Sequence, residues 1–330
     1  MPDNKHPFDV LTPDCVLQAV ENQGLLTDGR ILALNSYENR VYQVGIEDDV
    51  HIIVKFYRPQ RWSDEQILEE HQFSDELAAT DFPVVCPQKL ATGESLLSHV
   101  GLKMAFFERK GGRAPELDNL DNLYKLGQYM GRLHAVGELK DFKHRPTLDI
   151  QSSGYSSVET VLNTLMPDSL REAYSTLCAD LLKLIEQRFA AVDNLKLIRC
   201  HGDCHIGNIL WRDDKPHFVD FDDARMAPAI QDLWMLLSGS PNDQQLQLNE
   251  IIEGYEMFMP FNTAELSLIE PLRTLRLMHY SAWLAKRWED PAFPMHFPWF
   301  NTEVYWGQHI LELREQFSIL QEPLLQRSPF

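Results

Sequence analysis

Three side chains with oxygen donors stand at short, fixed intervals in the second half of the chain. Asp203 lies five positions before Asn208, and Asp220 follows the apolar pair Phe218-Val219. Phosphoryl transfer spreads negative charge over the phosphate oxygens, so it needs a divalent metal between the phosphates and a carboxylate that orients the attacking hydroxyl. Mg²⁺ prefers oxygen ligands such as carboxylates and amides. The pattern therefore predicts phosphoryl transfer, with Asp203 as the base and Asn208 and the catalytic Asp220 as Mg²⁺ ligands.

A simple turn and a zinc site are the two alternatives to a phosphoryl-transfer site in this segment. An isolated Asp beside glycines is usually only a turn, but three matched residues at fixed offsets, flanked by apolar runs, favour a site. Zinc ligands are also present, at Cys200, His201, Cys204 and His205. Such zinc sites usually draw on two separated clusters, and the sequence holds no second one. The spacing leaves open whether Asp222 also contacts the metal.

A strand and a helix in the first third of the chain supply a possible nucleotide clamp. Lys55 lies in the predicted strand 52–56, and protein kinases use a strand lysine to contact the α and β phosphates and pair with a helix glutamate. A helix is predicted over 64–79, with Ser63 and Gln66 as its capping box. Its apolar stripe includes Glu70, whereas Glu69 lies at the edge. A buried carboxylate needs a partner, so we predict that Lys55 pairs with Glu70.

The segment expected to hold the nucleotide phosphates has an unusual composition. Residues 34–42 contain no glycine, whereas protein kinases cover the phosphates with a glycine-rich hairpin. Backbone amides and the Ser36 hydroxyl would have to replace it. An ordinary polar hairpin turn explains the same residues equally well. Farther along, 107–113 leads from a strand into Lys110-Gly111-Gly112 and predicts a hinge beside the nucleotide, with a plain loop as the alternative.

Composition limits the classes of partner. The chain has 330 residues and a net charge of −19, which disfavours nucleic acid and anionic membrane as direct partners. No segment reaches the length of a membrane span, and the N-terminus lacks a signal sequence. Five cysteines at irregular spacings do not form a disulfide framework. We expect a cytoplasmic monomer with reduced thiols.

Several segments of the sequence resemble those of a known family. HGDCHIGNIL followed by FVDFDD is similar to the signature of the aminoglycoside phosphotransferase and choline kinase superfamily. LNSYENRVYQV, IVKFYRP, ILEEHQF, VDFDDARMAPAIQDLWMLL and DPAFPMHFPWF resemble the bacterial stress response kinase A family. The resemblance runs from about residue 11 to residue 325. It implies an α+β, bilobal, protein-kinase-like fold with a nucleotide-binding lobe (1–106), a hinge (107–113) and a catalytic and substrate lobe (114–330).

The same resemblance implies a function. It is ATP-dependent serine/threonine protein kinase activity in a stress response, with nucleotide contact near Ser36, Lys55 and Glu70. Nothing in the residue chemistry identifies the acceptor. A small-molecule kinase acting on an amino alcohol, homoserine or an aminoglycoside is the first alternative, and a non-catalytic nucleotide-binding module is the second.

Overall fold

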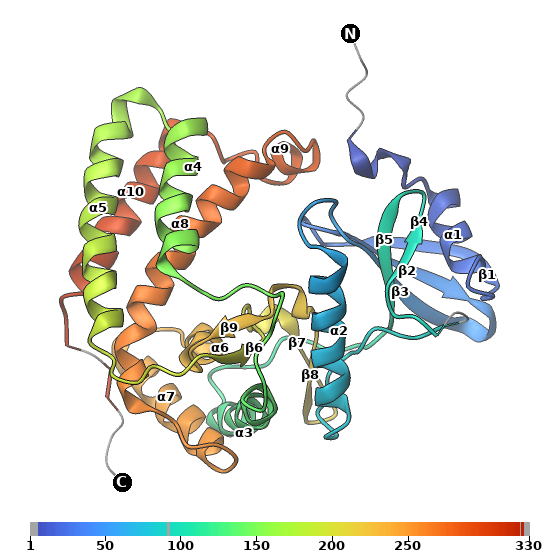
Figure 1. The fold of residues 1–330 in the computed structure, drawn as a ribbon, viewed down its shortest axis with the longest axis horizontal. Helices are drawn as coiled ribbons and strands as arrows, with labels where there is room; N and C mark the ends of the chain where they lie inside the picture. The colour runs from blue at the N-terminus through green and yellow to red at the C-terminus, as the bar shows by residue number, and fades with distance from the viewer. Residues whose placement is uncertain (1–5, 91–92, 324, 327–330) are drawn as a thin grey trace. The chain divides into compact units, whose positions relative to one another are not determined.

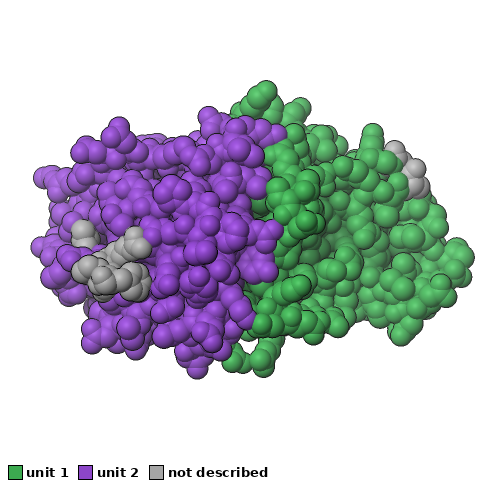
Figure 2. Space-filling model, turned by 90° about the horizontal axis from the view of Figure 1, so that it is seen from below, with its two compact units in different colours: residues 1–116, 142–145, 203–224 green, residues 117–141, 146–202, 225–330 purple. Residues whose placement is uncertain are grey.

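The described residues divide into two compact units. The computed structural model describes residues 6–90, 93–323 and 325–326. One unit holds the chain up to Glu116 together with 142–145 and 203–224, and the other holds 117–141, 146–202 and the chain from Arg225 onward (Figure 2). The predicted base Asp203 and the five residues predicted to bind nucleotide or metal all fall in the first unit. These units group segments by contact and are not the predicted lobes, whose hinge at 107–113 remains a prediction.

A five-stranded antiparallel sheet forms the framework of the first unit (Figure 1). Its strands lie in the order β1-β2-β3-β5-β4 and span Thr27–Leu34 (β1), Arg40–Ile46 (β2), Val50–Phe56 (β3), Leu102–Glu108 (β5) and Leu97–His99 (β4). The acidic turn Glu47–Asp49 joins β2 to β3, which pair as an antiparallel hairpin. Lys55 lies opposite Val41 on β2 and Ala105 on β5.

The two faces of this sheet carry different side chains, because neighbouring residues of a strand point to opposite faces. Val54 and Phe56 belong to the main core, which also includes Val16 and Val20 of α1 (Pro13–Glu21). Tyr57 instead joins a second cluster with Ile67 of α2 (Asp64–Ala78). Lys55, two residues before Tyr57, therefore lies on the α2 side.

Helix α2 begins as the sequence predicts. Ser63 Oγ accepts from the Gln66 amide at 3.3 Å, and Gln66 Oε1 accepts from the Ser63 amide at 2.9 Å, so the capping box is confirmed. The helix buries Ile67, Glu70, Phe73 and Leu77, as its apolar stripe predicts, and also His71 and Ser74. The Phe73 ring meets Phe221 edge-on at 6.0 Å between centroids. This contact joins α2 to the segment that follows Asp220.

A small hairpin connects Asn208 to Asp220. The short 3-10 helix Ile206–Asn208 leads into β7 (Ile209–Arg212), which pairs with β8 (Lys215–Phe218), and a second 3-10 turn covers Phe221–Asp223. The Val219 amide donates to the Asn208 carbonyl at 3.0 Å. The hairpin thus returns the chain to Asn208 just before Asp220, although twelve positions separate the two residues.

The second unit is mainly helical. It contains α3 (Leu120–Gly137), α4 (Ser156–Thr164), α5 (Asp168–Ala190), α6 (Ile230–Leu233), α7 (Pro241–Glu256), α8 (Ile269–Arg287), α9 (Ala292–His296), α10 (Glu303–Ile319) and the short pair β6 (Ile198–Cys200) and β9 (Arg225–Ala227). The 3-10 segment Thr263–Leu268 precedes α8, which becomes α-helical at Ile269. Pro271 then falls in the first turn, where its missing amide is tolerated. Among the described helices, none is long and apolar enough to cross a membrane.

Helices α3 and α7 approach closely at glycine positions. A Cβ at Gly127 would lie 2.1 Å from the Ile251 carbonyl oxygen, and one at Gly254 would lie 2.0 Å from that of Tyr124. The aromatic-rich segment near the C-terminus contributes to the core. Phe293, Phe300 and Trp306 are fully buried, while Trp299 is exposed.

Candidate active site

The loop that carries Asp203 is held by Asn208. The Asn208 side-chain amide donates from Nδ2 to the Asp203 carbonyl at 3.0 Å. Because the nitrogen is committed to this bond, Oδ1 of Asn208 is turned toward the opposite side. His205 Nε2 lies 3.5 Å from Asp203 Oδ2, and the Gly207 amide donates to His205 Nδ1 at 3.0 Å. The loop therefore fixes its own shape and presents an amide oxygen suited to a cation.

Asp220 has a strained backbone. Its φ and ψ are 60° and 62°, in the left-handed region. Asp enters this region more readily than most residues, but such a conformation still costs about 1–3 kcal/mol and persists only where the surroundings impose it. Its carboxylate is about half exposed. Strain of this kind gathers at functional sites, which agrees with the predicted role of Asp220.

Lys55 lies between two carboxylates. Its Nζ is 2.8 Å from Asp220 Oδ1 and 3.1 Å from Asp222 Oδ1, and the side chain is almost fully buried. Burial by itself would lower the pKa of Lys55, but the charges of Asp220 and Asp222, with a smaller contribution from Glu70, reverse that effect and raise it. Lys55 therefore stays protonated, which its predicted contact with phosphate requires.

The expected direct pair between Lys55 and Glu70 is not what the structure shows. The ion pairs of Lys55 are made with Asp220 and Asp222 instead. Glu70 is buried as predicted, but its carboxylate acts on Lys55 only through longer-range electrostatics. Burial raises the pKa of Glu70 to about 7, although Lys55 and Arg145 partly oppose this shift. The cause is geometric: the turn after β8 brings two carboxylates closer to Lys55 than α2 brings Glu70.

We predict a pH dependence of stability from this buried carboxyl. The ordinary pKa of Glu70 is 4.5 and its folded value is about 7, so the native state retains a proton that the unfolded state has lost. The free energy of unfolding should therefore fall as pH rises from about 5 through 7. Urea unfolding of the ligand-free protein at several pH values measures this, and Glu70→Gln should flatten the curve. Burial also raises the pKa of Glu265 to about 7, so Glu265→Gln is the matched comparison and should flatten the curve in the same way. A pH dependence unchanged in Glu70→Gln would contradict the raised pKa of Glu70.

Asp222 contacts three side chains of the first unit. It contacts Lys55, its Oδ2 accepts from Arg61 Nη1, and the Asn39 side-chain amide donates to the same oxygen at 3.2 Å. Burial would raise its pKa, but Lys55 and Arg61 outweigh this and hold the pKa of Asp222 well below its usual range. Its Oδ1 has no hydrogen-bond partner among the described residues.

The glycine-free segment between β1 and β2 is braced by arginines. Arg58 donates from Nε to the Glu38 carbonyl at 2.8 Å and from Nη2 to the Tyr37 carbonyl at 3.2 Å. Arg40 Nη1 lies 3.2 Å from the carbonyls of Tyr37 and Asn39. Side-chain bonds thus give this loop a defined shape without glycine. Ser36 lies half-buried in the same loop, and its contact with nucleotide remains a prediction.

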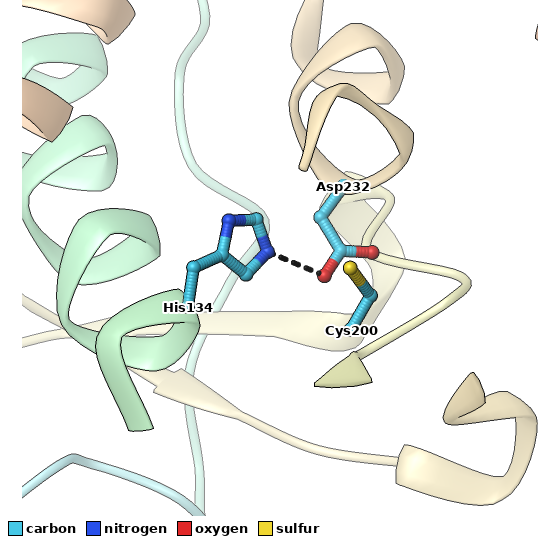
Figure 3. Close-up of side chains that lie close together, drawn as sticks. All are labelled: His134, Cys200 and Asp232. Carbon is cyan, nitrogen blue, oxygen red and sulfur yellow. Dashed lines mark hydrogen bonds and ion pairs between the residues drawn. The ribbon is translucent and has the colours of Figure 1, made fainter. Parts of the chain in front are cut away.

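A buried polar cluster in the second unit offers other ligand atoms (Figure 3). His134 Nε2 lies 3.1 Å from Asp232 Oδ2, and the Cys200 thiol is nearby, with all three residues fully buried. Asp232 also accepts from the amides of His201 at 2.7 Å and Gly202 at 2.8 Å, while His134 Nδ1 meets the Tyr255 hydroxyl at 3.1 Å. These hydrogen bonds already use both ring nitrogens of His134 and the carboxylate of Asp232. The cluster fixes the backbone of the two residues that precede Asp203 in the chain.

The first unit provides the chemistry that a divalent cation requires. The Asn208 amide oxygen, the half-exposed Asp220 carboxylate and the buried Asp222 carboxylate, whose Oδ1 pairs with Lys55, all offer hard oxygen donors, the type that Mg²⁺ prefers. These residues fit the predicted metal. By contrast, the group of potential ligands whose atoms converge within 4.8 Å among the described residues is His134, Cys200 and Asp232, not the four-residue zinc set considered from sequence.

Several residues of the site were missed from sequence. Asn39 and Arg61 connect the loop before β2 to the turn after β8, and Arg58 braces that loop. Arg145 bonds the turn directly, and Glu69 bonds the backbone of Arg145. The strings that carry the family resemblance include Asn39, Arg58 and Glu69, whereas no sequence pattern indicated Arg61 or Arg145.

Comparison with known proteins agrees with this geometry. The model of the Phosphotransferase enzyme family matches residues 30–269. Stress response kinase A of Escherichia coli O157:H7 is 46% identical over 335 residues, covering 100% of this chain and 99% of the relative. Serine/threonine protein kinase RdoA of Salmonella typhimurium is also 46% identical, with the same coverage.

Solved structures with the same fold are more distant in sequence. An amicoumacin kinase, solved with AMP-PNP and Ca²⁺, superposes with a TM-score of 0.71 at 18% identity over 95% of both chains. A microcompartment-associated aminopropanol kinase gives a TM-score of 0.70 at 16% identity, covering 95% of this chain and all of that one. They confirm the α+β, protein-kinase-like fold. With a family model that spans most of its length and relatives of 46% identity from end to end, this chain belongs to the phosphotransferase enzyme family.

Proposed function

We propose that this phosphotransferase moves the γ-phosphoryl group of ATP to a serine or threonine hydroxyl of a protein. The observation that carries the proposal is the placement of Lys55 beside Asp220 and Asp222. These two carboxylates follow the hairpin that begins directly after Asn208. A protonated lysine beside oxygen donors suits a metal-bound nucleotide. Identity of 46% across the whole chain with proteins named stress response kinase A and a serine/threonine protein kinase favours a protein acceptor.

Each residue has a role in this proposal. Asp203 orients the acceptor hydroxyl and takes its proton as the new O–P bond forms, while the bond from the γ-phosphorus to the β–γ bridging oxygen breaks and ADP leaves. Asn208 and Asp220 would hold Mg²⁺, which when bound neutralises charge on the transferring phosphoryl group. Lys55 contacts the nucleotide phosphates and gives up part of its contact with Asp220. The arginine-braced loop containing Ser36 lies over the phosphates, and Glu70 supports Lys55 electrostatically.

A small-molecule acceptor is the competing function. The solved structures with the same fold are named as kinases of amicoumacin and of aminopropanol. The net charge of −19 suits basic protein segments and amines alike, so charge does not separate the two.

Direct labelling separates these functions. Purified protein is incubated with γ-labelled ATP and Mg²⁺, once with a general protein substrate and once with amino alcohols, homoserine and aminoglycosides. We expect label on serine or threonine of protein, and no label when Asp203→Asn replaces the wild type. Fast transfer to one small molecule, with none to protein, would overturn the protein acceptor. Label on neither, from protein that still binds ATP, would favour a non-catalytic nucleotide-binding module.

A further inference from the structure

The backbone that follows Asp220 is held by one buried arginine. Arg145 donates from Nε to the Ala224 carbonyl at 2.8 Å and from Nη2 to the Asp222 carbonyl at 2.5 Å. Its guanidinium lies over the Trp62 ring, 4.2 Å from the centroid, and the residue is buried. A planar guanidinium that bonds two carbonyls at once fixes their relative orientation, which a lysine cannot do. Residues 220–224 are called the Asp220 turn below.

Arg145 is itself positioned by helix α2. The Glu69 carboxylate accepts three consecutive amides, from Lys143 at 2.6 Å and from His144 and Arg145 at 2.8 Å each. These bonds lower the pKa of Glu69, against the opposing effect of burial. Gln66 adds a bond from Nε2 to the His144 carbonyl at 2.9 Å. The segment 142–145 consequently groups with the first unit, although the chain on both sides belongs to the second.

These contacts explain how the Asp220 turn stays in its strained shape. A left-handed aspartate persists only where its surroundings over-determine the backbone. The Asp220 carboxylate restrains the turn through Lys55, whereas Arg145 restrains the main chain two and four residues later. We propose that Arg145, aimed by Glu69, is a positioning residue that holds the Asp220 turn in its metal-binding shape. This inference rests on the proposed role of Asp220 as a metal ligand.

Glu69 has a larger role in this proposal than its position on the helix suggests. It lies at the edge of the buried stripe, where a replacement would be expected to have little effect. Three hydrogen bonds to consecutive amides instead make Glu69 the link between α2 and the Asp220 turn. If Glu69 and Arg145 only stabilised the fold, a folded variant would keep its metal affinity. Metal binding therefore distinguishes a positioning role from a purely structural one.

The test measures Mn²⁺ binding by electron paramagnetic resonance, with AMP-PNP present and no turnover. The variants are Arg145→Lys and Glu69→Gln, and the control is Glu65→Gln, an exposed carboxylate one helical turn earlier. Outer-shell partners of metal ligands typically change affinity 10–100-fold. We expect a loss of roughly 10-fold or more in Mn²⁺ affinity for both variants and none for the control. The apparent KM for Mg²⁺ should rise, while AMP-PNP binding without metal stays close to wild type.

A double-variant cycle tests whether the two residues act as one device. If Glu69 works through Arg145, the Glu69→Gln/Arg145→Lys protein should lose no more affinity than the weaker-binding single variant. Multiplicative losses would mean that the residues act separately and would overturn the relay.

Other results for Mn²⁺ binding would overturn the positioning role. Wild-type Mn²⁺ affinity in folded Arg145→Lys and Glu69→Gln would overturn the positioning role while leaving the proposed function intact. A folded wild-type protein that binds no Mn²⁺ would remove Asp220 as a ligand and this inference with it. If Arg145→Lys fails to fold, the less buried Glu69→Gln carries the test alone.

Discussion

Replacing Asp203 by asparagine is expected to lower turnover by roughly 10²–10⁴-fold, the usual effect of losing a positioned general base. The reason is chemical, because an amide accepts no proton from the acceptor hydroxyl. The fold should survive, since the bond from Asn208 goes to the main-chain carbonyl of Asp203 and not to its carboxylate. Nucleotide affinity should remain near wild type, because Lys55 and Asp220 are untouched.

The measurement pairs single-turnover kinetics with calorimetric binding of Mg²⁺ and AMP-PNP. Asp213→Asn is the matched control. It lies in the β7–β8 turn with an exposed side chain and a φ of 51° that asparagine also tolerates, so its turnover should not change. Wild-type-like turnover in Asp203→Asn would remove Asp203 from the mechanism.

Local patterns explain the parts of the molecule that could be predicted. The capping box at Ser63 and Gln66 depends on two residues three positions apart. Burial of Glu70 follows from helical periodicity alone. Such features are encoded within one element, and they were confirmed.

The contacts that shape the site could not be predicted in the same way. Lys55 reaches Asp220 across 165 positions and Asn39 reaches Asp222 across 183, so no local period reports them. Asp220 takes a backbone shape for which glycine would be the usual sequence signal, and arginines replace glycines in shaping the loop before β2. Glu69 seemed peripheral because its partners, the amides of 143–145, come from a distant segment.

Asp220→Asn and Asp222→Asn are expected to fail in different ways, although the two residues stand two positions apart. Asparagine keeps the left-handed backbone of residue 220, and the buried Lys55 retains Asp222 as its countercharge. Asp220→Asn should therefore fold with nearly unchanged stability, yet lose Mg²⁺-dependent binding of AMP-PNP and at least about 10²-fold in activity.

Asp222→Asn should lose stability first. Its carboxylate is buried and faces Lys55 and Arg61 together with the Asn39 amide, so an asparagine leaves two buried cations short of countercharge. Breaking such a network costs about 3–5 kcal/mol, which urea unfolding would show as a large drop in midpoint. Calorimetry with Mg²⁺ and AMP-PNP is run on whichever variants remain folded. A folded, stable Asp222→Asn that cannot bind the metal complex, beside an Asp220→Asn that can, would transfer the ligand role to Asp222, because then Asp222 and not Asp220 would be presenting its oxygen to the metal.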